Sequence, residues 1–370
     1  KVVGVTGTNG KTTTTALIYS LLLDLGYKVA LSGTRGFFIN EKRVEEKSLT
    51  TVDLLSNYAR IAQAKLKGCD YYVTEVSSHA IDQERLEGID FELKVLTNIT
   101  SDHLDYHKSL QNYVDTKNSF FGDEGLKLIN KDEKKAKYNP KNAYTYSIEE
   151  SASFSLRAYR LSPRLEGVIE FGSSSACFDS NMLGKFNLSN IVASVAAVEL
   201  VSGKKLEDIC EQVESFGGVE GRLEIVSEDP LVIVDFAHTE DGMKQVFESF
   251  PDRAISAVFG AGGDRDRTKR PFMGRIAGMY AKYIYVTNDN PRGEEPESIV
   301  QDIMIGLEGK NNVSVVLDRK EAIVRALDEL PKDGVLLILG KGDEEYMEIK
   351  GKKIPFKDRE IIKDYFKSRT

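Results

Sequence analysis

The chain has 370 residues, of which 41% are hydrophobic and 29% are charged, so it is long enough for two or more ordinary domains. Its formal net charge of −8 disfavours a general nucleic-acid binder, and no apolar run reaches the length of a membrane span. The three cysteines are scattered singly, which argues against a disulfide framework or a cysteine metal site and indicates a reducing cytoplasm.

The first part of the chain alternates β-branched runs with helical patterns. The expected strands are residues 2–6, 71–75 and 94–99, and the first expected helix is residues 12–25. This alternation is typical of a parallel sheet covered by helices, so we expect an α/β fold from the first residues onward.

Around residues 144–178 the pattern changes to short segments with alternating polar residues, which we interpret as antiparallel strands. Residues 184–201 return to an apolar helical pattern, and the Gly-rich residues 216–226 are typical of a hinge. A second α/β series follows, with expected strands at residues 231–236, 255–260, 283–287, 313–317 and 335–339. The sequence therefore predicts two α/β domains, residues 1–220 and 221–370.

A phosphate-binding loop is expected directly after the first strand, where the sequence reads VVGVTGTNGKTTTT. Gly7 and Gly10 allow close backbone approach, Lys11 can reach the outer phosphates of a nucleotide, and the Thr12 hydroxyl can bind Mg²⁺. The common pattern G-x-x-x-x-G-K-[ST] has an upstream glycine that falls at Val5 here. The alternative is a plain strand–turn–helix corner with a solvated lysine.

Two polar clusters follow later strands. TEVSSHAIDQER places Glu75 at the end of one expected strand, and TNITSDHLDYH places His103 after another. Ligands bind at the carboxyl ends of strands in open α/β sheets, so a carboxylate and an imidazole near nucleotide phosphates indicate a metal site. The alternative for either residue is a hydrogen-bonded loop side chain.

Ten motifs, in order, resemble those of the Mur ligases, which build the peptide of peptidoglycan in bacteria. They include GVTGTNGKTTT, TNITSDHLDYH, YVDTKNSFF, GKFNLSN, VDFAHTEDGM, TNDNPRGEEP and GKGDEEY. The resemblance implies a central ATP-binding domain with a phosphate loop and a mostly parallel sheet, followed by a Rossmann-like C-terminal α/β domain. The family's N-terminal domain, which holds a uridine nucleotide, has no counterpart in the motifs found, so we expect the chain to come from a longer protein. A bacterial cytoplasmic location follows from the same resemblance.

The resemblance also implies a reaction and its cofactors. ATP phosphorylates a substrate carboxylate to an acyl phosphate, and an incoming amine then displaces phosphate to form an amide. Glu75 and His103 match the family's metal ligands, beside Thr12, for two Mg²⁺ ions. Lys117 matches a lysine that most Mur ligases carry as a carbamate, and Lys11 completes the catalytic set. The implied nucleotide-binding residues are Gly7, Thr8, Asn9, Gly10, Lys11, Thr12, Thr13, Asn187, Asn190, Arg222 and Asp235.

The implied substrates are a UDP-muramoyl-dipeptide and meso-diaminopimelate. Residues matching the muramoyl-dipeptide site are Thr50, Thr51, Ser77, Gln83 and Arg85. Residues matching the diaminopimelate site are Arg265, Asp289, Asn290, Arg292, Gly340 and Glu344. In the DNPR motif, Arg292 would face the distal carboxylate of diaminopimelate. L-Lysine lacks this carboxylate, so a buried arginine would have no partner on the substrate if L-lysine were bound. Asp343 departs from the family, which has histidine at this position.

Other functions stay open at this point. Folylpolyglutamate synthase and other Mur ligases, including lysine-adding ones, share the phosphate loop, although the DNPR and GKGDE motifs disfavour them. A P-loop switch protein would read nucleotide state, but no convincing guanine-reading N-K-x-D follows the loop. An inactive fragment is a third alternative. We expect a monomer with small-molecule partners only, and neither nucleic acid nor membrane.

Overall fold

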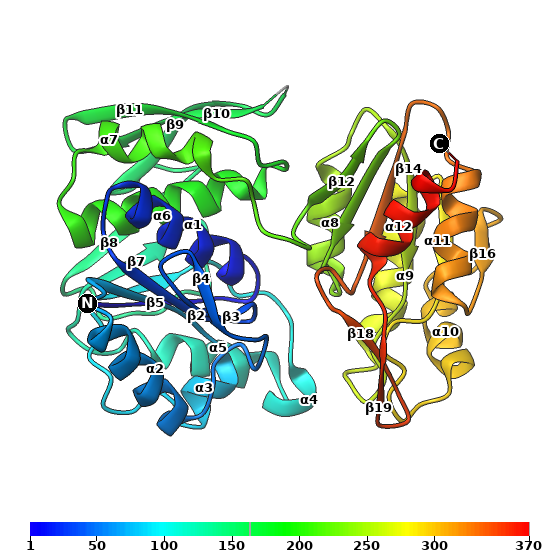
Figure 1. Cartoon of the computed structure of the whole chain (residues 1–370), viewed down its shortest axis with the longest axis horizontal. Helices are drawn as coiled ribbons and strands as arrows, with labels where there is room; N and C mark the ends of the chain where they lie inside the picture. The colour runs from blue at the N-terminus through cyan, green and yellow to red at the C-terminus, as the bar shows by residue number, and fades with distance from the viewer. Residues whose placement is uncertain (163, 370) are drawn as a thin grey trace. The chain divides into compact units, whose positions relative to one another are not determined.

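The computed structural model describes residues 1–162 and 164–369 and divides into two compact units, Lys1–Gly218 and Val219–Thr370. We call them the N-terminal and C-terminal units and describe each by itself. Both are built of sheets and helices, as expected for the α/β class (Figure 1). Within the described residues, no helix has the length and apolar character needed to cross a membrane.

The N-terminal unit is built on one eleven-stranded sheet with the order β11-β10-β9-β8-β7-β6-β1-β5-β2-β3-β4. Its strands are β1 (Val2–Thr6), β2 (Val29–Gly33), β3 (Gly36–Ile39), β4 (Lys42–Glu45), β5 (Tyr71–Val76), β6 (Leu93–Leu96), β7 (Lys127–Asn130), β8 (Ala143–Ser147), β9 (Phe154–Arg160), β10 (Leu165–Phe171) and β11 (Ser174–Ser180). The run from β9 to β2 is parallel, and both ends of the sheet are antiparallel.

The helices of this unit cover both faces of the sheet. They are α1 (Lys11–Asp24), α2 (Leu54–Leu66), α3 (Ser78–Asp82), α4 (Leu104–His107), α5 (Leu110–Ser119), α6 (Phe186–Ser202) and α7 (Leu206–Glu211), followed by a 3₁₀ turn at Gln212–Ser215. Figure 1 shows α1 and α6 together on one side of the central strands, and α2, α3 and α5 on the other. The strands in the middle are buried and β-branched, as double coverage requires.

The prediction of antiparallel strands between residues 144 and 178 is correct for the pairs β9–β10 and β10–β11 but wrong for β8. β8 pairs in parallel with both β7 and β9. Alternation of polar and apolar residues reports only that one face of a strand is solvated, and it carries no information on strand direction. The order β6-β1-β5-β2 is the result that matters for function, because it places the ends of four parallel strands side by side.

The C-terminal unit has a six-stranded sheet with the order β12-β13-β17-β14-β15-β16 and a separate β18–β19 hairpin. Its strands are β12 (Glu224–Glu228), β13 (Leu231–Asp235), β14 (Ala254–Phe259), β15 (Tyr283–Val286), β16 (Val313–Val315), β17 (Gly334–Leu339), β18 (Tyr346–Ile349) and β19 (Lys352–Pro355). All five expected strands form, and they are parallel, whereas β12 adds an antiparallel edge.

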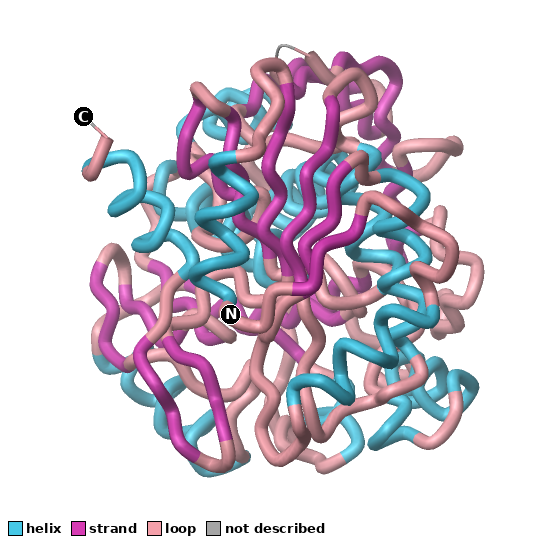
Figure 2. The backbone as a smooth tube through the Cα atoms, turned by 90° about the vertical axis from the view of Figure 1, so that its right-hand side faces the viewer, coloured by secondary structure: helices cyan, strands magenta, loops and turns pink. Residues whose placement is uncertain are grey.

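Helices flank this second sheet as well (Figure 2). They are α8 (Glu240–Glu248), α9 (Lys269–Tyr280), α10 (Pro296–Ile305), α11 (Arg319–Asp328) and α12 (Asp358–Lys367). A fully buried ion pair joins α11 to α12, with Arg319 Nη2 2.7 Å from Asp358 Oδ2. The same guanidinium donates to the carbonyl oxygen of Leu339 at the end of β17, so it stabilises the backbone just before Gly340.

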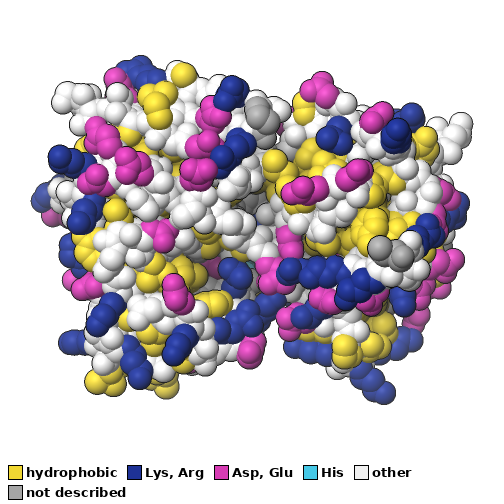
Figure 3. Space-filling model, turned by 45° about the horizontal axis from the view of Figure 1, so that its top comes forward, with side chains coloured by type: hydrophobic (Ala, Val, Ile, Leu, Met, Phe, Trp, Pro, Cys, Tyr) yellow, Lys and Arg dark blue, Asp and Glu magenta, His cyan; other side chains and the backbone are white. Residues whose placement is uncertain are grey.

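Acidic and basic side chains are interspersed on the face of the protein that Figure 3 shows. This mixture agrees with a net charge of −8 on a surface that carries many lysine and arginine side chains.

Candidate active site

The expected phosphate loop lies between the end of β1 and the start of α1. Gly10 precedes the helix with φ 84°, and Gly7 has φ 154°, both in the region that favours glycine. Lys11 Nζ donates to the carbonyl oxygens of Gly7 and Thr8 at 2.8 and 2.9 Å. The ammonium therefore lies over the loop, beside the N-terminus of α1, where an anion is favoured.

The segment after β6 supports this loop from one side. Thr97 Oγ1 donates to the carbonyl oxygen of Asn9 at 2.6 Å, and Asn98 binds the same residue twice, through its Nδ2 and its Oδ1. Thr8 N also donates to the Asn98 carbonyl oxygen. The motif that contains this segment indicated a metal site and gave no sign that it supports the loop, although Thr and Asn side chains are suited to such bonds.

A side chain at Gly7 has no room in this arrangement. A Cβ there would lie 1.8 Å from Thr97 Oγ1, at a φ that other residues rarely adopt. We expect Gly7→Ala to destabilise the protein by roughly 2–4 kcal/mol and to weaken ATP binding strongly. Thermal melting and equilibrium ATP binding measure the two effects. Gly172→Ala, at a positive φ with open space around it, controls for backbone strain alone. An unchanged melting temperature for Gly7→Ala would contradict this geometry.

Asn187 and Asn190, which are expected in the nucleotide site, lie buried on α6, against the start of α1. A Cβ at Gly10 would lie 2.5 Å from Asn190 Oδ1, which also accepts a hydrogen bond from Thr14 Oγ1. Asn190 Nδ2 donates to Asn187 Oδ1 at 2.8 Å. The pair therefore fixes the end of the phosphate loop, and its contact with a nucleotide stays a prediction.

Glu75, near the end of β5, meets the first turn of α1, directly after the loop. The Thr12 hydroxyl donates to Glu75 Oε2 at 2.9 Å, and Thr34 N donates to Oε1 at 2.8 Å. A threonine hydroxyl and a carboxylate at a phosphate loop suit Mg²⁺, which takes few protein ligands and completes its shell with phosphate oxygens and water. Within the described residues, no group of three or more His, Cys, Asp or Glu side chains is arranged to hold a metal ion by itself.

Lys117, on α5, is fully buried beneath the loop. Its Nζ donates to the carbonyl oxygen of Gly7 at 2.9 Å, the same oxygen that Lys11 contacts. Burial holds the pKa of Lys117 well below the ordinary lysine value, and the charge of Lys11 lowers it further. Lys117 therefore carries an amine that loses its proton far more readily than an exposed lysine.

His103 belongs to a cluster of rings on the far side of Tyr113. Its ring lies 4.9 Å from that of His79 and 6.4 Å from that of Tyr113, and its backbone has φ 53°. The Tyr113 hydroxyl lies 2.8 Å from Thr8 Oγ1, and its ring lies 5.0 Å from Lys117 Nζ. Tyr113 thus links the histidine cluster to the phosphate loop, a role that the sequence analysis did not assign.

The expected muramoyl-dipeptide residues form one hydrogen-bonded chain that starts at Glu75. Thr51 Oγ1 donates to the Glu75 carbonyl oxygen and accepts from Ser77 N. Arg85 Nη1 donates to the Thr51 carbonyl oxygen at 2.8 Å, and its other edge binds Gln83 Oε1. Thr50 joins through Thr34, 3.1 Å between their hydroxyl oxygens. The structure brings all five together beside the loop.

In the C-terminal unit, several of the residues expected to bind diaminopimelate gather around a lysine that was not predicted as a site residue. Lys341 is fully buried, and its Nζ donates to Glu344 Oε2 at 2.9 Å and to Asn290 Oδ1 at 3.3 Å. Asn290 Nδ2 donates to the same Glu344 oxygen. Asp289 Oδ1 is 3.9 Å from Lys341 Nζ, and a Cβ at Gly340 would collide with the Asp289 carboxylate. The lysine of the GKGDE motif therefore holds this acidic cluster together.

Arg292 stands beside this cluster, with one fifth of its side chain exposed. Its Nη1 donates to the Gly263 carbonyl oxygen at 2.8 Å, and its Nε lies 3.3 Å from Glu348 Oε2. Arg265 approaches the same place, because Gly262 lies close to both arginines. A carboxylate within the protein, that of Glu348, therefore lies at the Nε edge of Arg292, and no sequence motif indicated it.

Asp235, an expected nucleotide-binding residue, lies buried at the end of β13. Its two oxygens accept the backbone N–H groups of Leu223 and Ala237, each at 2.7 Å. Burial raises the pKa of Asp235, although Arg222 opposes the shift. The guanidinium of Arg222 stacks 4.2 Å from the ring of Phe236. Asp235 and Arg222 thus lie near each other, while their contact with a nucleotide stays a prediction.

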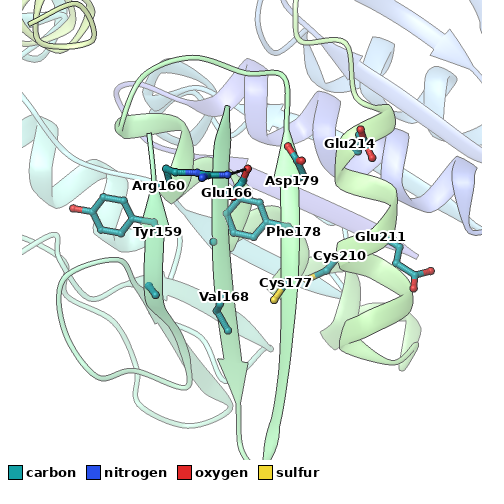
Figure 4. Close-up of a pocket in the computed structure, with 12 residues that line it drawn as sticks. Tyr159, Arg160, Glu166, Val168, Cys177, Phe178, Asp179, Cys210, Glu211 and Glu214 are labelled. Carbon is teal, nitrogen blue, oxygen red and sulfur yellow. Dashed lines mark hydrogen bonds and ion pairs between the residues drawn. The ribbon is translucent and has the colours of Figure 1, made fainter. Parts of the chain in front are cut away.

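A cavity of about 630 Å³ lies elsewhere in the N-terminal unit, between β9, β10, β11 and α7 (Figure 4). It lies at the β11 edge of the sheet, whereas the phosphate loop follows β1 in the middle. Arg160 and Glu166 form an ion pair on its wall. None of the expected site residues is among the described residues that line it, so it is not part of the site described above.

Comparison with known proteins gives consistent matches over the whole chain. The Mur ligase middle domain matches residues 5–198, and the Mur ligase glutamate ligase domain matches residues 221–342. The UDP-N-acetylmuramoyl-L-alanyl-D-glutamate--2,6-diaminopimelate ligase of Wolinella succinogenes is 59% identical over 97% of this chain and 83% of its own length. The Helicobacter pylori enzyme of the same name is 54% identical over 99% and 84%. A solved structure of a ligase with this name is 32% identical, with a TM-score of 0.69, and the match covers 100% of this chain and 78% of that one.

Proposed function

The chain belongs to the Mur ligase family, and on that premise we propose that it joins meso-diaminopimelate to UDP-N-acetylmuramoyl-L-alanyl-D-glutamate with the use of ATP. The product is an amide, and the reaction serves peptidoglycan precursor synthesis in the bacterial cytoplasm. Within the family's architecture, residues 1–220 correspond to the central ATP-binding domain and residues 221–370 to the C-terminal domain. The enzyme works as a monomer on small-molecule substrates.

The observation that carries the proposal is the phosphate loop, where the Thr12 hydroxyl and the Glu75 carboxylate meet at 2.9 Å beside Lys11. Phosphoryl transfer depends on positioning and on neutralising the charge of the transferred group, and these residues supply both. Magnesium bound here would neutralise phosphate charge, with Thr12 and Glu75 as its protein ligands and His103 at a second site. Thr50, Thr51, Ser77, Gln83 and Arg85 would then orient the muramoyl-dipeptide carboxylate toward the loop.

Lys117 fits a carbamate for a chemical reason. Only the neutral amine adds to CO₂, and the lowered pKa of Lys117 supplies more of that form than an ordinary lysine does. The addition forms a nitrogen–carbon bond and releases a proton, and it converts a cation into an anionic oxygen ligand. A bare ammonium beneath the loop would repel a second Mg²⁺, whereas a carbamate would bind it.

The direct test is ATP-dependent ligation with the UDP-muramoyl-dipeptide as acceptor of the phosphoryl group, comparing meso-diaminopimelate with L-lysine as the incoming amine. Phosphate release and the mass of the product are measured together. We expect diaminopimelate to be strongly preferred. ATP hydrolysis that proceeds equally well without either amine would favour a nucleotide switch and overturn the ligase proposal.

The substrate assignment predicts a specific defect for Arg292→Ala. The distal carboxylate of diaminopimelate would lose its cationic partner and would face Glu348 instead. Losing a partner of such a charge pair costs about 2 kcal/mol or more, so the KM for diaminopimelate should rise roughly thirtyfold, while the KM for ATP changes little. Arg292→Lys should rescue poorly, because an ammonium lacks the planar fork. An unchanged KM for diaminopimelate would exclude Arg292 from the acceptor site.

A further inference from the structure

The loop that carries Arg292 is fastened to strand β18. Arg292 N donates to the Glu348 carbonyl oxygen at 2.9 Å, and Lys350 N donates to the Arg292 carbonyl oxygen at 2.7 Å. These two bonds form a parallel bridge opposite Ile349. Arg292 adopts φ 51°, in the left-handed region that costs energy for a residue with a side chain. The bridge therefore fixes Arg292 in one backbone conformation beside Glu348.

The side chain of Glu348 is aimed at Arg292 from this bridge. Its Oε2 lies 3.3 Å from Arg292 Nε, and its backbone N–H donates to Asn290 Oδ1 at 2.8 Å. Nearly one third of the Glu348 side chain is exposed, so the carboxylate is within reach of solvent and of a ligand. Two neighbouring residues of the acceptor cluster, Asn290 and Arg292, are thus both tied to Glu348.

A carboxylate on the acceptor would meet this arrangement at close range. The guanidinium has five donors and can bind two carboxylates on different edges, but the carboxylates repel each other. An acceptor without a distal carboxylate, such as L-lysine, is not repelled by Glu348, and Arg292 keeps Glu348 as its counter-charge. Leaving that charge unbalanced would otherwise disfavour such an acceptor.

We infer that Glu348 is a specificity-determining residue, an internal counter-ion of Arg292 that competes with the distal carboxylate of the acceptor and so moderates the preference for diaminopimelate over L-lysine. This inference rests on the proposed function, since it concerns the same site. Removing the charge of Glu348 should therefore increase the preference for diaminopimelate over L-lysine. If Glu348 instead helped to bind diaminopimelate, its removal would decrease that preference.

The test is Glu348→Gln, which keeps the shape of the side chain and all backbone bonds of β18. Relief of one like-charge contact near the surface corresponds to about a threefold to tenfold lower KM for diaminopimelate. The inhibition constant of L-lysine, measured as a competitor of diaminopimelate, should rise by a similar factor. The KM for ATP should stay the same. Glu348→Asp withdraws the carboxylate by one methylene and should shift both constants in the same directions, but less.

Glu345→Gln is the matched control, because Glu345 lies three residues away and pairs with Lys357 at 2.8 Å. It should leave both acceptor constants unchanged. A higher KM for diaminopimelate in Glu348→Gln would mean that Glu348 positions Arg292 for the substrate, and it would overturn the inference, as would no change. Calorimetric titration of the wild-type protein with diaminopimelate distinguishes a failure of this inference from a failure of the proposed function. Absence of binding there would overturn the proposed function itself.

Discussion

Lys11→Ala is expected to abolish ligation while the protein stays folded. Lys11 Nζ donates to the carbonyl oxygens of Gly7 and Thr8, in the loop that it covers. Its charge is needed where negative charge gathers on the transferred phosphoryl group. Loss of one such charge lowers kcat/KM by about a thousandfold or more in comparable sites. Steady-state ligation kinetics measure the effect, and circular dichroism with thermal melting checks the fold.

Lys11→Ala has a second consequence, at Lys117. The two ammonium groups share the Gly7 carbonyl oxygen, and Lys11 is one of the causes that lower the pKa of Lys117. Without Lys11, the pKa of Lys117 should rise and its amine should react with CO₂ less readily. Lys134→Ala, an exposed lysine paired with Glu150, is a suitable control and should keep full activity. Near-normal turnover by a well-folded Lys11→Ala protein would remove Lys11 from the mechanism.

The phosphate loop and most of the parallel strands could be predicted because their signals are local. A β-branched run, a glycine turn and a helix start within fifteen residues indicate β1, the loop and the beginning of α1. The strands of the C-terminal unit are equally plain, since strands buried on both faces are continuous apolar runs. The edge strand β4 gave no such signal, because all four of its residues are exposed and only Val44 among them is apolar.

The supports of the site could not be predicted, because they depend on contacts between distant segments. Nothing near Asn9 in the sequence indicates that Thr97 and Asn98 bind it, since β6 and β1 become neighbours only in the folded sheet. The same holds for Glu348 and Arg292, which meet through a bridge between a loop and a short hairpin. The motifs predict which residues face the substrates, and they gave no signal for the residues that hold those side chains in place.

Lys117→Ala is expected to lose ligase activity by at least about a hundredfold and to recover part of it when a short carboxylate such as acetate or formate is added. The substitution leaves a small space beneath the loop where Lys117 was fully buried. A small carboxylate could place its oxygens there and replace those of a carbamate. An ordinary structural lysine would not respond to carboxylates, so rescue is the informative measurement.

Lys127 provides the matched control, because it is also fully buried and its pKa is also lowered by burial. Its Nζ donates to the carbonyl oxygens of Asp123 and Lys141, away from the loop. Lys127→Ala should therefore show no rescue by carboxylates. In the wild-type protein, the carbamate adds the mass of CO₂ to Lys117, and its formation rises with pH as the amine loses its proton. Since the pKa of Lys117 is lowered, this rise should occur well below the pH at which an exposed lysine reacts. Full activity in CO₂-free buffer, together with an unmodified lysine by mass, would exclude the carbamate and leave Lys117 as a buried amine that only supports Gly7.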